Sequence, residues 1–164
     1  MPYPHTALPA LLLDYARLRD VLTVFSRDLN YQTAPHGGSP NHPDMRRLLE
    51  QLRQVDMPHH IRMSRGLFAR IGQRCPPLVP VLVRMDREHA QLEPMYLELV
   101  AALDSAPSIV SPDDAALVQQ VKRFIDVVLG HLGVEENYIL SVATDFLTAQ
   151  DWIDMEPVHG RHAT

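Results

Sequence analysis

Apolar residues recur every three or four positions over four long stretches of the chain, and this spacing constrains the fold more than any other feature. Such a period places the apolar side chains on one face of an α-helix. We expect helices over about residues 8–30, 43–72, 79–104 and 112–148, separated by loops rich in proline, glycine and serine. The stripe expected to be buried on the third helix consists of Leu82, Met85, His89, Leu92, Tyr96, Leu99 and Leu103.

The length of the chain and of its helices predicts one all-α domain. A chain of 164 residues is long enough for a single domain with a sizeable core. Helices of about 20 to 35 residues with connections of moderate length suit an antiparallel up-and-down four-helix bundle. Residues 155–164 follow the last helix, and we expect this tail to be flexible.

The charge and the composition exclude several classes of function. The formal net charge is −5 and no basic stripe is visible, which argues against nucleic-acid binding. No apolar stretch approaches the roughly 18 residues of a membrane helix, and the N-terminal segment lacks the basic start of a signal peptide. The single cysteine, Cys75, cannot form an internal disulfide. We therefore expect a cytoplasmic protein that binds neither nucleic acid nor membranes.

Ionisable residues interrupt the apolar stripes at similar heights on three helices. His131 and Glu135, four residues apart, lie on the stripe of the fourth helix, His89 lies on that of the third, and His59 or its neighbour His60 lies on that of the second. A buried carboxylate without a partner costs several kcal/mol. Histidines converging on a carboxylate are therefore better explained by a bound cation, and this ligand chemistry suits iron, manganese or zinc.

Three segments carry a resemblance to a known family. "FIDVVLGHLGVEENYILSVATDFL" resembles an H-x-x-x-E-E helix, "REHAQLEPMYLEL" an E-H helix, and "MPHHIRMSRGLF" a P-x-H-H-x-x-E-E-x-x-L-F stretch, all typical of the hemerythrin-like, or HHE cation-binding, family. The similarity spans nearly the whole chain. It implies a four-helix bundle in which histidines and two bridging carboxylates hold a pair of non-haem irons. Carried over to this sequence, the implied metal ligands are His59, His89, His131 and Glu135.

Two positions depart from the family pattern. Met63 stands where the second helix of the family supplies a glutamate, and Tyr15 stands where the first helix supplies a histidine. A thioether cannot bridge two ferric ions or neutralise their charge. We therefore expect an altered metal site that holds one or two ions.

Three arrangements of such an altered site are open. Glu93, four residues after His89, is a candidate for an additional ligand from the same helix. Tyr15 is a candidate for a phenolate ligand of iron(III). Alternatively one metal is lost, and His89, His131 and Glu135 surround a single ion, the two-histidine, one-carboxylate set of non-haem iron(II). His60 is a further candidate, either as a ligand or as a residue that supports one. Glu136 is a candidate for a supporting or surface role.

The resemblance implies a range of functions. Relatives in the family bind or sense dioxygen, nitric oxide or iron, handle peroxide, or assist iron–sulfur repair. Our first hypothesis is a non-haem metal-binding protein, with iron as the metal, that binds or senses a small diatomic ligand or iron itself, and we allow for a homodimer. The alternatives are a peroxide-handling redox enzyme and a degenerate bundle whose empty site serves as an interaction module.

Overall fold

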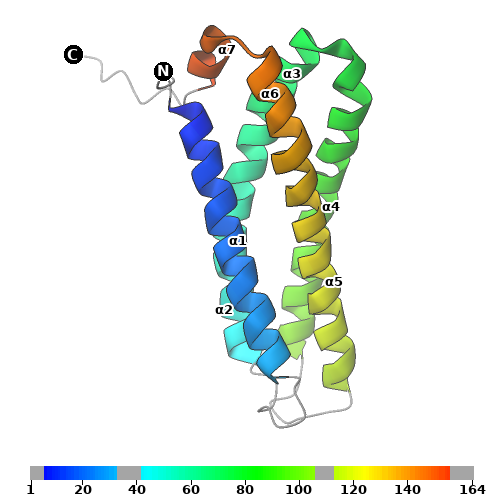
Figure 1. The fold of residues 1–164 in the computed structure, drawn as a ribbon. Helices are drawn as coiled ribbons and strands as arrows, with labels where there is room; N and C mark the ends of the chain where they lie inside the picture. The colour runs from blue at the N-terminus through cyan, green and yellow to red at the C-terminus, as the bar shows by residue number, and fades with distance from the viewer. Residues whose placement is uncertain (1–5, 33–41, 106–112, 156–164) are drawn as a thin grey trace, which may run out of the picture.

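The regular structure of the described part of the chain is entirely helical. The computed structural model describes residues 6–32, 42–105 and 113–155 (Figure 1), so the predicted flexible tail, apart from Met155, lies outside the described residues. In chain order the α-helices, the π-helical segments η1 and η3 and the 3-10 turn η2 are α1 (Ala7–Gln32), α2 (His42–Ile61), η1 (Arg62–Phe68), α3 (Ala69–Arg74), η2 (Pro76–Leu78), α4 (Val79–Ser105), α5 (Asp113–Val134), η3 (Glu135–Ile139), α6 (Leu140–Phe146) and α7 (Ala149–Asp154).

The long helices form a bundle around one core. In Figure 1, α1, α2, α4 and α5 lie side by side along most of their lengths. α1 packs against α2 and α5, and α4 packs against the same two helices, so the four enclose a common interior. The prediction of an all-α bundle is therefore confirmed. None of the described helices has the length and apolarity needed to cross a membrane.

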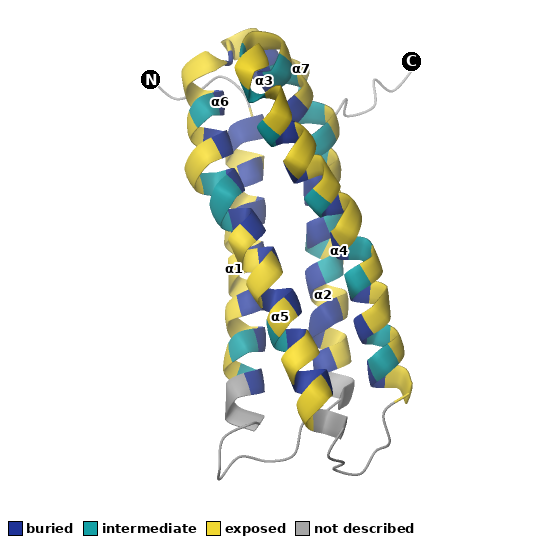
Figure 2. Ribbon diagram, turned by 90° about the vertical axis from the view of Figure 1, so that its right-hand side faces the viewer, coloured by how far each residue is buried: buried dark blue, intermediate teal, exposed yellow. Residues whose placement is uncertain are grey.

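The core consists of the apolar stripes seen in the sequence. Figure 2 shows that the buried faces of the helices turn toward one another and the exposed faces turn outward. Every residue of the stripe expected on the third helix is buried in α4. On α1, Leu18, Leu22 and Phe25 are completely inaccessible to solvent. Helical periodicity alone was enough to identify these positions.

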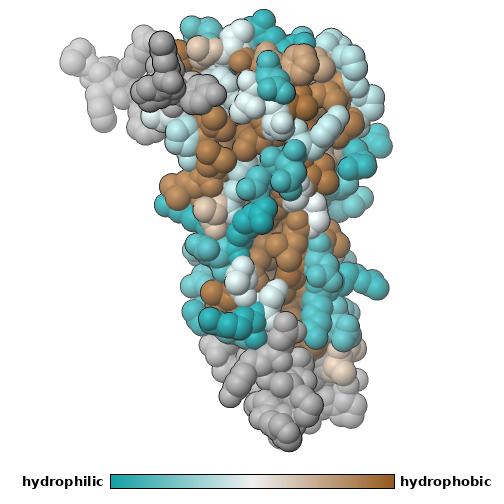
Figure 3. Space-filling view, in the orientation of Figure 1, coloured by the Kyte–Doolittle hydropathy of each residue, from teal (hydrophilic) through white to brown (hydrophobic). Residues whose placement is uncertain are grey.

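The outer surface is not uniformly polar. Hydrophobic side chains run between polar ones along the face that α1, α5 and α6 present in Figure 3. Exposed large apolar residues on these helices include Leu12, Leu13 and Phe146. Exposed apolar side chains are ordinary on protein surfaces, so this stripe by itself identifies no partner.

Two of the expected helices differ from a regular α-helix in their interiors. The helix expected over 43–72 contains the seven π-helical residues of η1, and the helix expected over 112–148 contains the five residues of η3. A π-helical turn holds an extra residue, so the side chains after it are rotated relative to those before it. η1 begins two residues after His60, and η3 begins at Glu135, so both changes occur where the ionisable residues lie.

A short C-terminal helix, which the sequence analysis did not anticipate, closes one end of the bundle. Thr148 and Asp151 form a reciprocal capping box at the start of α7. The Asp151 carboxylate also accepts a hydrogen bond from Arg74 Nε at 2.9 Å, which ties α7 to α3. Trp152 is buried by this docking, and α7 also contacts α1.

We expect Asp151→Asn to loosen α7, because it removes the charge that Arg74 binds and weakens the cap. The predicted loss is about 1–2 kcal/mol in the free energy of unfolding. Trp152 is the single tryptophan of the sequence, so its fluorescence should shift to longer wavelength in the variant. Asp145→Asn, at an exposed position on α6, is the control. Unchanged emission and stability in Asp151→Asn would show that α7 docks without this carboxylate.

Candidate metal centre

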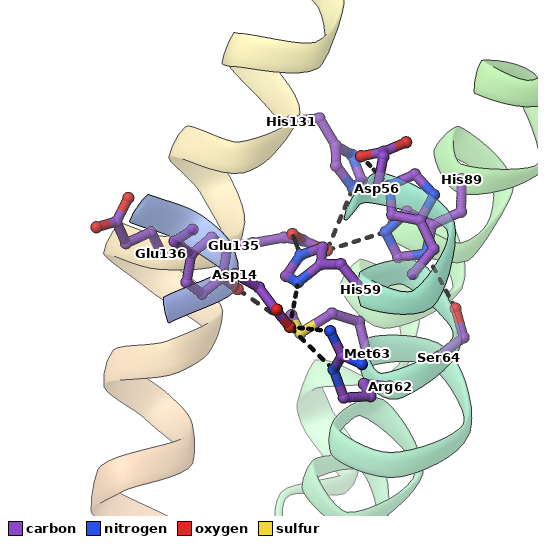
Figure 4. Close-up of polar contacts among 12 residues, drawn as sticks. Asp14, Asp56, His59, Arg62, Met63, Ser64, His89, His131, Glu135 and Glu136 are labelled. Carbon is purple, nitrogen blue, oxygen red and sulfur yellow. Dashed lines mark hydrogen bonds and ion pairs between the residues drawn. The ribbon is translucent and has the colours of Figure 1, made fainter. Parts of the chain in front are cut away.

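Glu135 is the centre of a buried polar cluster inside the bundle. Its carboxylate is completely inaccessible to solvent. His59 Nε2 lies 2.9 Å from Oε2, and His89 Nε2 lies 2.9 Å from Oε1. His131 Nε2 lies 3.2 Å from Oε1. His131 stands four residues before Glu135 on the same helical column, by which we mean the consecutive elements α5, η3 and α6. Side chains from α2, α4 and α5 therefore meet at one carboxylate (Figure 4).

The convergence expected from the sequence is thus present in the structure. His59, His89, His131 and Glu135, the four residues that the family resemblance implies as ligands, are all buried and in mutual contact through the carboxylate. Their role as metal ligands stays a prediction. The spacing of four residues between His131 and Glu135 placed both on the inner face of the column, as helical geometry requires.

His60 belongs to the same cluster but lies on a different side of it. It is buried, and its ring stacks on that of His89 with centroids 4.0 Å apart. The ring centroid of His131 lies 5.8 Å away. Nitrogen atoms of His60, His89 and His131 all lie within 4.8 Å of one another, which is close enough for a common cation. The pair of adjacent histidines on α2 therefore flanks the cluster from two directions.

Oxygen atoms support the outer ring nitrogens of these three histidines. Ser64 Oγ lies 2.9 Å from His89 Nδ1, and Glu88 Oε2 lies 2.9 Å from His131 Nδ1. Asp56 Oδ1 lies 3.1 Å from His60 Nε2. Such contacts fix the orientation and tautomer of histidines that bind metals.

The sequence analysis did not identify these supporting residues. Asp56 stands four residues before His60, and Glu88 stands in the "REH" of the family-like segment, so a search for carboxylates near each histidine would have found both. Ser64 had no such signal, because its contact depends on the π-helical geometry of η1.

The two positions that depart from the family pattern touch each other. The hydroxyl of Tyr15 donates to Met63 Sδ at 3.6 Å, and both side chains are buried. The Tyr15 ring also lies edge-on to His59, with centroids 4.8 Å apart. Burial, together with the negative charge of Glu135, raises the pKa of Tyr15 above its ordinary value. The phenol is therefore held in its protonated form.

A partly buried ion pair covers the same side of the cluster. Arg62 Nε donates to Asp14 Oδ2 at 2.9 Å, and that oxygen lies 3.8 Å from His59 Nδ1. Burial opposes the charge on Asp14, but His59 and Arg62 outweigh it and lower the pKa of the carboxyl. Asp14 was not singled out as a site residue from the sequence, because its neighbours on α1 gave no motif.

The structure does not bring Glu93 or Glu136 into the cluster. Glu93 Oε1 pairs with Arg53 at 2.9 Å on the outside of the α2–α4 contact. Glu136 pairs with Arg19 of α1, and it points away from Glu135 in Figure 4. On a helix, the residues directly before and after an inward-facing residue point away from the core, so Glu136, next to Glu135, lies outside the cluster.

Glu135 and His59 neutralise each other in the absence of any bound ion. Burial opposes the charge on Glu135, but its three histidine partners outweigh that effect and hold the pKa of the carboxyl well below its usual range. Burial likewise opposes charge on His59, yet contacts with Asp14 and Glu135 raise its pKa to about 9. At neutral pH the cluster therefore holds a carboxylate and an imidazolium.

The donor set fits a metal cation. It consists of imidazole nitrogens and carboxylate oxygens, the ligands that iron and zinc share. Within the described residues four buried atoms of the cluster make no hydrogen bond: Asp56 Oδ1, His59 Nδ1, His60 Nε2 and His131 Nε2. Buried polar atoms without hydrogen bonds are uncommon in folded proteins. His131 Nε2 faces Glu135 Oε1, so a cation bound beside that oxygen would give this nitrogen a partner.

Comparison with known proteins identifies one match. The family model described as the hemerythrin HHE cation binding domain matches residues 10–143, which run from α1 into α6 and include every residue of the cluster. No curated protein and no solved structure matches the chain.

We expect the metal-free protein to lose stability as the pH rises from about 6.5 to about 9. The pKa of His59 is raised from 6.5 to about 9 in the folded state, so its protonation stabilises the fold fully below the lower value. The stabilisation disappears as His59 loses its proton, with a loss on the order of 2 kcal/mol. Urea unfolding at several pH values in the presence of a chelator measures it.

The matched control is His59→Gln, which keeps a hydrogen-bond donor but cannot titrate. Its free energy of unfolding should vary less with pH over the same range. Equal slopes for the wild type and the variant would show that His59 is not charged in the folded protein.

Proposed function

Because the chain belongs to the hemerythrin HHE cation-binding domain family, we propose that it is a non-haem iron protein whose cation binds at the cluster around Glu135. The observation that carries this proposal is the burial of Glu135 with histidine nitrogens from three helical columns within 3.2 Å of its oxygens. The proposed ligands are His89, His131 and Glu135 together with a histidine of α2, for which the family pattern implies His59. Iron matches this mixture of nitrogen and oxygen donors.

The chain's own residues would bind, orient and shield the ion. Ser64 and Glu88 hold the rings of His89 and His131, and the packed bundle excludes bulk water. Iron bound there would supply a coordination position for a small diatomic ligand. We therefore propose a binder or sensor of such a ligand, or of iron itself, rather than an enzyme. The alternate directions of α1, α2, α4 and α5 in Figure 1 support the up-and-down connectivity expected for this family.

A second candidate function rests on the altered positions. The Tyr15–Met63 contact and the Glu135–His59 pair leave the interior well packed and electrically compensated without a metal. A bundle that is stable without a metal could serve as an interaction module whose site is empty. The two candidates differ in one measurable property, the content of tightly bound iron.

We expect the wild type to bind iron(II) in an anaerobic titration and Glu135→Gln to bind it at least about 100-fold more weakly, because a neutral amide removes the buried anionic ligand. Glu136→Gln is the matched control, since this neighbouring glutamate is partly exposed and pairs with Arg19. Elemental analysis of the protein as isolated gives an independent value of the stoichiometry. A wild type that binds no iron by either measurement would favour the interaction module.

A further inference from the structure

The two oxygens of Glu135 have different surroundings. Oε1 faces the nitrogens of His89 and His131, and His60 stacks against His89 on that side. Oε2 faces His59, and beyond it lie the phenol of Tyr15 and the thioether of Met63. The first side therefore offers three imidazoles, whereas the second offers one.

The neighbours of Oε2 are already engaged with one another. The Tyr15 hydroxyl donates a hydrogen bond to the Met63 sulfur, and Arg62 donates to the Asp14 carboxylate. His59 lies between two carboxylates, with Nε2 at 2.9 Å from Glu135 and Nδ1 at 3.8 Å from Asp14. This arrangement is that of a side chain that positions a carboxylate, since each of its nitrogens faces a carboxylate oxygen.

The neighbours of Oε1 have the pattern of a ligand shell. His60, His89 and His131 each have one ring nitrogen beside a supporting oxygen, from Asp56, Ser64 and Glu88 respectively. Their nitrogens come within 4.8 Å of one another. Both His60 and Asp56 are more than nine-tenths buried, yet His60 Nε2 and Asp56 Oδ1 make no hydrogen bond within the described part of the chain. A metal-bound imidazole is a stronger donor, so a cation would improve this contact.

A small cavity adjoins His60 from the α2–α4 side. Its volume is about 10 Å³, and Asp56, His60 and Leu92 are among the residues that line it. A cavity of this size holds about one water molecule. Arg53, Glu93 and Tyr96 also line it, so the outer face of His60, where Asp56 lies, adjoins a small space with polar walls.

We propose that the cation lies on the Oε1 side of Glu135, bound by His60, His89, His131 and Glu135, and that one cation binds per chain. His59, the ligand that the family pattern implies, is instead a positioning residue that holds Glu135 through Oε2. This inference rests on the proposed function, because it presupposes that the cluster binds a cation. In this arrangement the α2 ligand is His60 instead of His59, and Asp56 orients the His60 ring.

The adjacent histidines provide a matched pair of variants, His59→Gln and His60→Gln. Cobalt(II) is the probe, since each bound imidazole gives one shifted, exchangeable N–H signal in the proton NMR spectrum. We expect one cobalt ion and three such signals in the wild type, in line with the three clustered histidines. His60→Gln should lose one signal and bind cobalt at least about tenfold more weakly, and Asp56→Asn should weaken binding while keeping three signals.

His59→Gln should keep all three signals and one cobalt ion, because the glutamine amide can still donate to Glu135. Three results would each overturn the inference and leave the proposed function standing. These are the loss of a signal in His59→Gln, unchanged signals and cobalt affinity in His60→Gln, and two cobalt ions per wild-type chain. A wild type that binds neither cobalt nor iron would end both. Circular dichroism and thermal unfolding show whether each variant is folded. If His60→Gln does not fold, His60→Asn takes its place.

Discussion

The burial of the Glu135 carboxylate is the constraint on which the site depends. A charged group in a helical core is strongly unfavourable unless opposite charge or hydrogen bonds compensate it. Here the compensation comes from imidazoles on α2, α4 and α5. These helices must therefore stay in one axial register with Glu135, because a shift along the bundle would separate the carboxylate from its partners. The polar cluster thereby ties the alignment of the bundle to the geometry of its site, which apolar packing alone would specify less strictly.

The π-helical segments explain how one short stretch supplies so many of these contacts. η1 presents three consecutive side chains to three targets: Arg62 to Asp14, Met63 to Tyr15 and Ser64 to His89. η3 begins at Glu135 itself. A wider turn costs regular backbone hydrogen bonding, and it is found most often where side chains must be aimed at a site. In this bundle both wide turns occur at the level of the cluster.

The fold and the centre of the site could be predicted from periodicity, whereas the surroundings of the site could not. Leu82 to Leu103 and the pair His131 and Glu135 follow from helical spacing, which depends only on local geometry. The contacts of Asp14, Asp56, Ser64 and Glu88 join helices that are distant in sequence, and no local pattern encodes them. Glu93 shows the converse case: its spacing after His89 made it a candidate ligand, whereas in the structure its carboxylate pairs with Arg53.

Charge compensation would limit how many ions the proposed site could hold. The family arrangement uses two bridging carboxylates, and Met63 removes one of them without supplying any charge. Of the carboxylates close to the cluster, Asp14 is already matched by Arg62, and Glu88 lies behind His131, partly exposed. Glu135 is the buried anion that faces the proposed ion, and Asp56 is buried behind His60. The charges of these two carboxylates balance one divalent cation at most. A second cation would bring two uncompensated charges into a medium of low dielectric constant, at a cost that the remaining imidazoles cannot offset.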